Sequence, residues 1–252
     1  MLRKLLLLSL LCLPLAAQMA GPAVAAEAPL TIGLGVGIST SEYRQMDATV
    51  LPLPFINYEG ERFFLRGFTG GLHLFKNDMH EVSLTVSYLP QSYDASESGS
   101  RAMRRLDDRY STMLAGAGYA LTTRWGTARL SASGDVLGTS DGIIVDGSYA
   151  YPLTFGRVNL TPSLGVTWTS EHYNDYYYGI SGKESRKSGY GTYDPDSGFS
   201  PYAGVNAKVD IGYGFGLMMN GKAKYLSDEI RDSPMVTRDM TLSFGAGLTY
   251  SF

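Results

Sequence analysis

Hydrophobic residues alternate with small or polar residues along the last fifteen positions of the chain, 238–252. The apolar positions are Leu242, Phe244, Ala246, Leu248, Tyr250 and Phe252, and serine, threonine or glycine lies between them. Successive side chains of a β-strand point to opposite faces, so this period of two indicates a strand with different surroundings on its two faces. Strands of soluble domains usually contain about 5 to 6 residues. The pattern here is typical of a strand that crosses a bilayer, which needs about 9 to 11 residues.

The same alternation recurs along most of the chain. It predicts strands at 31–40, 82–88, 109–121, 125–137, 142–152, 158–168, 199–211 and 215–225. The apolar set of nearly every strand ends in Tyr, Trp or Phe, as expected of the aromatic girdles at a membrane surface. We therefore predict an all-β fold, a single transmembrane antiparallel β-barrel. The alternative is a soluble β-sandwich, which would need polar outer faces.

Two segments near the beginning break the pattern. The strand at 50–58 contains Pro52 and Pro54, which cannot donate to a ladder, so we expect it to be irregular or bulged. Segment 62–76 is either one long strand or two short ones, 62–68 and 71–75. Single-chain barrels have an even number of strands, short periplasmic turns and long outer loops. Splitting segment 62–76 gives twelve strands, with ten as the alternative, and makes 90–108, 170–198 and 227–237 outer loops.

The first residues have the composition of a secretory signal peptide. Arg3 and Lys4 precede an apolar run at 5–15, and Ala23-Val24-Ala25 provides small residues at a cleavage spacing. We expect residues 1–25 to be removed and residues 26–252 to form one barrel domain. The only cysteine, Cys12, lies in the segment expected to be removed. The mature protein would then have no disulfide and no thiolate metal site.

Composition supports a barrel and argues against one class of partner. The chain has 30 Gly and 18 Tyr and only 18% charged residues, and its formal net charge is −3. Removal of Arg3 and Lys4 would make the charge more negative, which argues against nucleic acid as a partner.

Four motifs add a family resemblance. They are LPLPFINY at 51–58, YNDYYYGI at 173–180, SPMV at 233–236 and GLTYSF at 247–252. In this order and spacing they resemble the MltA-interacting protein (MipA/OmpV) family. The resemblance implies an outer-membrane protein of Gram-negative bacteria without catalytic residues or a cofactor. It also implies a scaffold that links a lytic transglycosylase with a peptidoglycan synthase. A narrow channel for small solutes and a surface adhesin are the alternatives.

Charged residues at inward positions of the predicted strands are candidates for the lumen. They are Arg129, Asp135, Asp146, Lys208, Asp210, Lys222 and Lys224. Isolated charges are costly in such a place. Either they pair across strands and fill the interior, or they line a narrow wet pathway. Their near balance of sign predicts no ion selectivity.

Three further sets of residues are candidates for contacts outside the lumen. Tyr173, Tyr176, Tyr177 and Tyr178 would form an outer-loop contact surface for carbohydrate or protein, or would extend the aromatic girdle. Arg101, Arg104 and Arg105 would face lipopolysaccharide phosphates or remain a solvated charge run. Tyr250 and Phe252 resemble the carboxyl-terminal insertion signal of outer-membrane barrels, so membrane lipid and lipopolysaccharide are expected partners.

The three histidines do not predict an enzyme. His172 lies near Ser170, Glu171 and Asp175, but a hydrolase needs a nucleophile within about 3 Å of an oriented base, which residues of one loop seldom provide. His80 is expected in a turn. His73 has no acidic neighbour in sequence, and the three share no metal-ligand spacing. We therefore expect a protein without a catalytic, cofactor or metal site.

Overall fold

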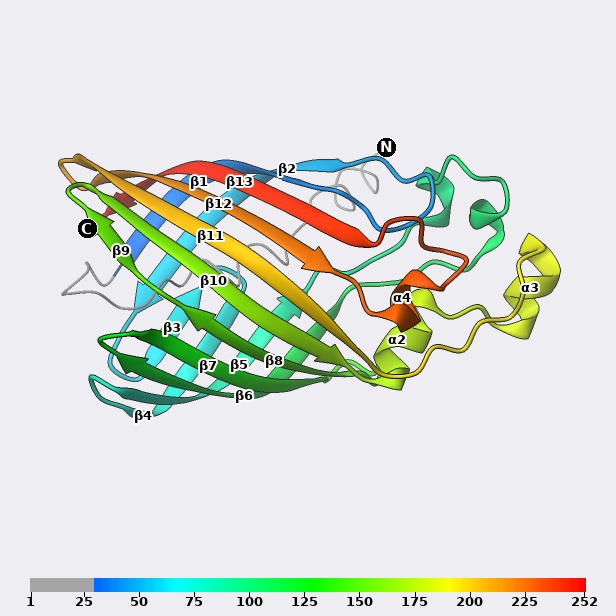
Figure 1. The fold of residues 1–252 in the computed structure, drawn as a ribbon, viewed down its shortest axis with the longest axis horizontal. Coiled ribbons are helices and arrows are strands. Elements are labelled where there is room, and N and C mark those ends of the chain that lie inside the picture. Colours follow the sequence, from blue (N-terminus) through cyan, green and yellow to red (C-terminus); the bar gives the residue numbers. More distant parts are fainter. Residues whose placement is uncertain (1–29) are drawn as a thin grey trace.

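The computed structural model describes residues 30–252, which form a closed antiparallel β-barrel with a cap at one end (Figure 1). The expected signal peptide lies outside the described residues. The strands are β1 Leu30–Ser39, β2 Thr49–Glu59, β3 Phe63–Arg66, β4 Thr69–Lys76, β5 His80–Leu89, β6 Thr112–Thr123, β7 Gly126–Asp135, β8 Ile143–Ala150, β9 Leu153–Phe155, β10 Val158–Thr169, β11 Gly198–Gly212, β12 Phe215–Tyr225 and β13 Met240–Ser251. No helix in this part of the chain has the length and hydrophobicity needed to cross a membrane.

The barrel has twelve strands and one extra short strand, which confirms the predicted count. Segment 62–76 is split into β3 and β4, as the parity of the strands required. The extra strand arises because β8 and β9 pair with successive parts of β10 and are interrupted at Tyr151-Pro152. We expected 153–156 to be the turn, but it is shorter: Leu153–Phe155 continues the ladder, and Gly156 takes a positive φ of 61°.

Pairing of the first strand with the last closes the barrel. Residues Thr31 to Ser39 of β1 pair with Ser251 to Ser243 of β13. Glycines on the inner face of this seam make room for large side chains of β2. A Cβ at Gly247 would lie 2.4 Å from the Phe55 ring, and one at Gly37 would lie 2.7 Å from Leu53. Leu53 and Phe55 are therefore buried, and they fill this side of the lumen.

Of the two expectations for β2, irregular or bulged, the bulge was wrong. Every residue of β1 has a partner in β2 without a shift of register. The ladder with β3, by contrast, covers only Asn57 to Glu59 of β2. The Ile56 carbonyl accepts from Gly67 N–H, so the backbone groups of Ile56, and by alternation those of Pro54 and Pro52, point toward the β3 side. The prolines thus lie where β2 has no ladder partner among the described strands, and no bond is lost.

Apolar side chains cover the outside of the barrel. Leu34 is 67% exposed and Leu248 is 59% exposed, whereas Ser243 and Thr249, on the opposite face of the last strand, are buried. Such a surface is stable only against lipid. This distribution confirms the predicted alternation and excludes the soluble sandwich.

The two ends of the barrel differ in their connections. One end has short turns and the other has long loops, which in barrels of this kind are the periplasmic and outer ends. The loops expected to lack periodic structure contain 3₁₀ turns and short helices: η2 Ala95–Glu97, η3 Met103–Arg105, α2 Glu171–Tyr178, α3 Gly182–Ser188 and α4 Asp228–Arg231. These elements gather at the outer end (Figure 1).

The outer loops share one hydrophobic core, which we call the outer cap. Its buried members come from loops 40–48, 90–111, 170–197 and 226–239, and include Tyr43, Met103, Tyr177, Ile230 and Met235. Because residues far apart in sequence pack together here, the cap is a folded layer on top of the barrel.

Candidate functional site

The lumen holds a cavity of about 500 Å³ beneath the outer cap. Tyr43, Tyr173 and Tyr178 of the cap contribute to its lining, together with inward residues of the barrel. Many of the barrel residues are small and carry hydroxyl groups, among them Ser83, Thr85, Ser131, Ser133, Thr161, Ser163, Thr167 and Ser243. The barrel wall of the cavity therefore combines hydroxyl groups with apolar side chains such as Leu114 and Leu130, and tyrosines cover the outer end.

Four of the seven predicted lumen residues line this cavity, namely Arg129, Asp146, Lys222 and Lys224. The other three do not. Asp135 accepts hydrogen bonds from the backbone of Leu137, Ser140 and Asp141, so it organises the outer turn after β7. Asp210 is exposed and accepts from Gly212 N–H in the turn after β11. Lys208 is half-buried near the periplasmic end of β11.

Asp146 is held by hydroxyl groups. Its Oδ1 accepts from Tyr202 Oη at 3.0 Å and its Oδ2 accepts from Thr167 Oγ1 at 2.9 Å. The Tyr202 ring reaches Asp146 by lying over Gly165, where a Cβ would be 2.4 Å from Tyr202 Cζ. The Tyr202 ring also contacts a cation, because Lys222 Nζ lies 3.7 Å from the ring centroid. Tyr202 therefore connects the acidic and basic walls of the cavity.

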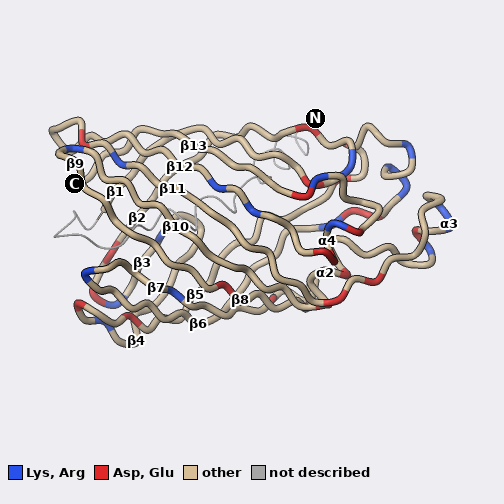
Figure 2. Tube along the Cα trace, viewed as in Figure 1, with Lys and Arg blue, Asp and Glu red and all other residues tan. Residues whose placement is uncertain are grey.

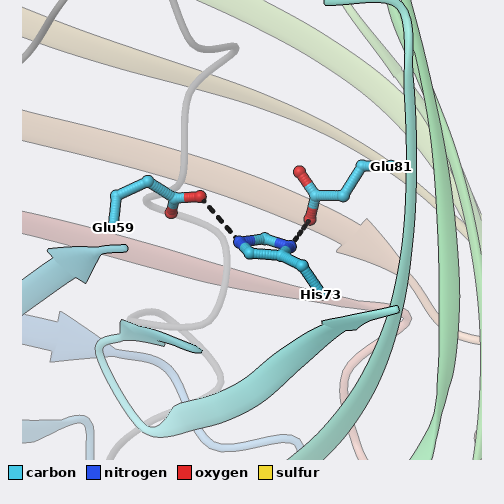
Figure 3. Close-up of side chains that lie close together, drawn as sticks. All are labelled: Glu59, His73 and Glu81. Atoms are coloured by element: carbon cyan, nitrogen blue, oxygen red, sulfur yellow. Dashed lines mark hydrogen bonds and ion pairs between the residues drawn. The ribbon is translucent and has the colours of Figure 1, made fainter. Parts of the chain in front are cut away.

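A second charged cluster, which the sequence reasoning missed, lies near the periplasmic end of the barrel. Arg66 on β3 donates to Glu59 on β2 at 2.9 Å and to Glu81 on β5 at 3.0 Å. Lys76 also contacts Glu59. His73 lies between the two carboxylates, with Nε2 3.1 Å from Glu59 and Nδ1 3.7 Å from Glu81 (Figure 3). Charges therefore do pair across strands in the lumen, as one of the two alternatives expected. The paired residues, however, are not among the seven that were predicted to face the lumen.

Glu59, His73 and Glu81 have the donor types of a metal site, and their ligand atoms lie within 4.8 Å of one another. The two carboxylates, however, are already neutralised by Arg66 and Lys76. A divalent cation would have to displace both basic groups. We therefore interpret the cluster as an ion-pair network that joins β2, β3, β4 and β5. Alternation could not show this cluster, because the β4–β5 ladder shifts register between His73 and Phe75, so that His73 and Lys76 both reach Glu59.

The outer-loop tyrosines are not arranged as expected. Tyr173, Tyr177 and Tyr178 are at most 6% exposed and belong to the core of the outer cap, so they form neither a contact surface nor part of the girdle. Tyr176 is half-buried and its hydroxyl accepts from Tyr110 N–H. Burial raises the pKa of Tyr178 well above its usual value, so its hydroxyl stays neutral and donates to Glu42 at 3.0 Å.

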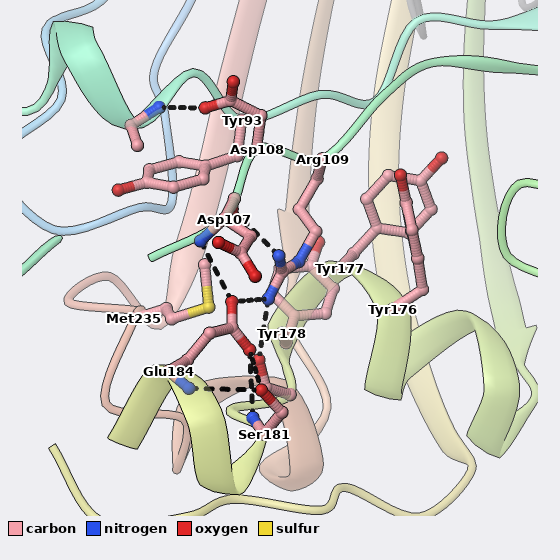
Figure 4. A network of polar contacts seen from close by, with 12 residues as sticks. Tyr93, Asp107, Asp108, Arg109, Tyr176, Tyr177, Tyr178, Ser181, Glu184 and Met235 are labelled. Atoms are coloured by element: carbon pink, nitrogen blue, oxygen red, sulfur yellow. Dashed lines mark hydrogen bonds and ion pairs between the residues drawn. The ribbon is translucent and has the colours of Figure 1, made fainter. Parts of the chain in front are cut away.

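One buried ion pair links two loops of the outer cap (Figure 4). Arg109 Nη2 lies 2.7 Å from Glu184 Oε1, and both side chains are less than a tenth exposed. Glu184 also completes a capping box at the start of α3, since its Oε2 accepts from Ser181 N–H and Oγ. Burial opposes the charge of Glu184, but the bonds from Ser181 and Arg109 outweigh it, so the pKa of this carboxyl lies below its usual value.

Exposed basic residues gather at the tip of the cap (Figure 2). Arg101, Arg104 and Arg105 are exposed as predicted, and Arg105 donates to the Lys187 carbonyl at 3.1 Å. The packing of η3 against α3 adds Lys183, Arg186 and Lys187 to the same surface. We call these six residues the basic patch. Sequence reasoning found only half of it because the two segments are distant in the chain.

The remaining histidines have structural surroundings. Ser170 Oγ accepts from Tyr173 N–H and Ile143 N–H, so it is the N-cap of α2 and is occupied by these backbone bonds. His172 is exposed in the first turn of that helix. The suspected serine–histidine arrangement is therefore not formed. His80 begins β5, directly after the turn, and its Nδ1 lies 2.7 Å from Tyr119 Oη.

The carboxyl terminus lies at the periplasmic rim. The rings of Tyr250 and Phe252 pack edge to face with centroids 4.9 Å apart, and Phe215 packs on the other side of Tyr250. Phe252 N–H donates to the Leu30 carbonyl. The last residue is thus part of the closing seam, and its role as an insertion signal remains a prediction.

A family comparison decides the classification. The sequence model of the family described as "MltA-interacting protein MipA" matches residues 32–252. The chain belongs to this family. The MltA-interacting protein of Escherichia coli (strain K12) is 40% identical over 227 residues, which cover 90% of this chain and 92% of the relative. The outer membrane protein OmpV of Vibrio cholerae is 24% identical over 220 residues, 85% of this chain and 83% of the relative.

Other comparisons agree with the location and the fold of a MipA family member. The putative outer membrane protein YiaT of Escherichia coli (strain K12) is 38% identical over 230 residues, 91% of this chain and 94% of that one. Among solved structures, the translocator domain of the autotransporter NalP from Neisseria meningitidis has a TM-score of 0.50 at 11% identity and covers 94% of this chain and 92% of its own. That likeness concerns the fold alone. The chain is an outer-membrane β-barrel.

Proposed function

We propose that this outer-membrane barrel is a non-enzymatic scaffold that binds a lytic transglycosylase at its periplasmic rim. The observation that carries the proposal is the 40% identity, over 90% of the chain, to a relative named for its interaction with MltA. The matched region spans the periplasmic turns, which are the part of the barrel that a periplasmic enzyme can reach.

The rim offers suitable side chains although its turns are short. Successive turns around the periplasmic end carry Arg124 and Trp125, then Phe155 and Arg157, then Tyr213. Trp125 is 61% exposed with the Arg124 guanidinium 4.9 Å from its ring centroid, and Tyr213 is 99% exposed. Trp, Tyr and Arg are the residues that most often dominate binding energy at protein interfaces. Short turns thus hold large anchors in fixed positions at low entropic cost.

Tyr213 in particular has an unusual conformation. Its φ is +55°, between Gly212 at +100° and Gly214 at +80°. A bulky residue rarely adopts a positive φ, and such positions often have a functional reason. The turn leaves almost the whole tyrosine side chain exposed at the rim.

Binding of a purified MltA-type lytic transglycosylase to the detergent-solubilised barrel tests the proposal. Biolayer interferometry should show saturable binding, and the W125A/Y213A variant should weaken it about tenfold or more, because hot-spot residues contribute about 2 kcal/mol or more. Tyr110→Ala removes a similarly exposed tyrosine at the outer end and should leave binding unchanged. The proposal fails if the native barrel does not bind the enzyme, or if W125A/Y213A and Y110A bind equally well.

A second candidate function is passage of small solutes, which the polar cavity favours. The outer cap covers that cavity, so passage would require the cap to move. Single-channel recording in planar bilayers distinguishes the two functions: a silent bilayer removes the channel and leaves the scaffold untouched. Burial of the tyrosines in the cap removes the observation that had suggested an adhesin.

A further inference from the structure

Three basic side chains of the cavity form no ion pair in the described part of the chain. They are Arg129, Lys222 and Lys224, and none of them forms an ion pair within residues 30–252. A charged group removed from bulk water is costly unless it is paired, so unpartnered cations in a lumen call for an explanation. The carboxylates of the cavity lining are the groups that could neutralise these cations.

Each carboxylate that lines the cavity is already engaged. Glu81 accepts from Arg66, and Asp146 accepts from Tyr202 and Thr167. Glu42 accepts from Gln91 Nε2 and Tyr178 Oη. Counting Arg66, four cations face three carboxylates, and the only ion pair among these groups is that of Arg66 with Glu81. The described lining therefore has an excess of positive charge.

The cations lie on two separate parts of the wall. Lys222 and Lys224 are two residues apart on β12, so they project from the same face of the strand. Lys224 is directly opposite Tyr202 in the ladder, and the same row continues through Gly165 and Ser148 to Arg129 on β7. Four strand spacings, about 19 Å along the curved wall, separate β7 from β12. The lysine pair and Arg129 are therefore separate anchoring points on different strands.

Small side chains keep the space between these cations open. Gly165 and Ser148 occupy the row, and the Tyr202 ring fills only the place above Gly165. Hydroxyl groups of Ser131, Ser133, Thr161 and Ser163 line the adjoining wall. Hydroxyls can donate and accept, so they suit the polar middle of an organic molecule. The cavity volume of about 500 Å³ is within the range of ligand pockets.

We propose that the lumen binds a small organic anion with two acidic groups, one held by Lys222 and Lys224 and the other by Arg129. The lysine pair is the main anchor, because two ammonium groups share one acidic group there. The guanidinium of Arg129 suits a carboxylate or phosphate at the far end, since it binds such groups with two parallel hydrogen bonds. The Tyr202 ring orients Lys222 through its contact with the ammonium group. This site is independent of the scaffold role, which uses the periplasmic rim.

Isothermal titration calorimetry of the detergent-solubilised full chain tests the site, with succinate as the dianionic probe and its neutral diamide, succinamide, as the matched control. Succinate should bind to the native barrel and succinamide should not. Added sodium chloride should weaken succinate binding, because chloride competes for the same cations and salt screens their attraction for the dianion. Equal heats from succinate and succinamide would overturn the proposal without any variant.

Variants then locate the site. Lys222→Gln with Lys224→Gln should weaken succinate binding at least tenfold, and Arg129→Gln should weaken it several-fold. Lys183→Gln removes the same charge from exposed α3 and should leave the affinity unchanged. Lys222→Arg with Lys224→Arg keeps the charges and should retain binding, which provides a folded reference if the glutamine variant does not insert. Native affinity in a folded K222Q/K224Q variant, or an equal loss in K183Q, would show that succinate binds elsewhere.

Discussion

The buried and exposed ion pairs between the same two cap segments allow a direct comparison. Arg109–Glu184 and Lys187–Asp107 both connect the loop after β5 with α3, but the side chains of the first pair are 8% and 4% exposed and those of the second are 44% and 51% exposed. Removing one partner of a buried pair leaves an uncompensated charge and typically costs about 3 to 5 kcal/mol. An exposed pair contributes about 0 to 1 kcal/mol.

Arg109→Gln should therefore open the cap locally while the barrel stays folded. Gln cannot neutralise Glu184, and the contacts of Arg109 with the Asp107 and Gly179 carbonyls are also lost. A cost of about 3 to 5 kcal/mol corresponds to roughly two to four orders of magnitude in the local opening equilibrium. Amide hydrogen exchange should rise by this amount in peptides covering 105–112 and 178–190.

Lys187→Gln is the matched control, since it removes a cation from the same pair of segments. Its exchange should rise by less than about tenfold. Peptides from β13 should exchange at the native rate in both variants, which shows that the barrel is intact. If R109Q and K187Q have the same effect on the cap peptides, burial does not determine the strength of this link and the reasoning is refuted.

Three more predictions follow from particular contacts. The pKa of Glu184 is lower in the folded cap than its usual value of about 4.5, so its charge stabilises the cap fully above pH 4.5. This stabilisation is lost as the pH falls through the pKa of the folded state. Proteolysis of the cap should therefore accelerate in acid, and it should accelerate less in E184Q. Gly247→Val should lower stability in urea by about 1 to 3 kcal/mol because its side chain meets Phe55, and adding Phe55→Ala should restore part of the loss. Arg101→Gln with Lys183→Gln should reduce binding of lipopolysaccharide in a salt-sensitive manner, whereas Arg124→Gln at the opposite rim should not.

The barrel could be predicted from the sequence because its rule is local. A strand exposes alternate residues to lipid, so a period of two is visible within any one segment such as 238–252. The split of segment 62–76 into two strands could also be predicted, because an even number of strands is needed to return the chain to the periplasm. The error at β2 came from applying the proline rule without knowing which side of the strand lacked a neighbour.

The site could be predicted only in part because its partners are distant in the chain. Alternation placed Arg129, Lys222 and Lys224 in the lumen correctly, but it could not show that Asp146 is bound by Tyr202 rather than by a cation. Likewise, Arg109 meets Glu184 across 75 positions. The tyrosines of α2 were taken for a surface because a polar loop was expected, whereas the outer loops pack on one another and bury them.

The chain closes its barrel without completing the sheet. Above the short β3–β4 hairpin, the flank of β2 from Thr49 to Phe55 has no ladder on the β3 side among the described strands. Such a flank would normally be a template on which a strand of a neighbouring molecule could dock. Pro52 and Pro54 remove the donors there, because their amide nitrogens carry no hydrogen. The two prolines thus prevent a strand of another molecule from pairing with this unpaired edge of β2. Replacing both with valine would restore the donors and allow aggregation by strand addition.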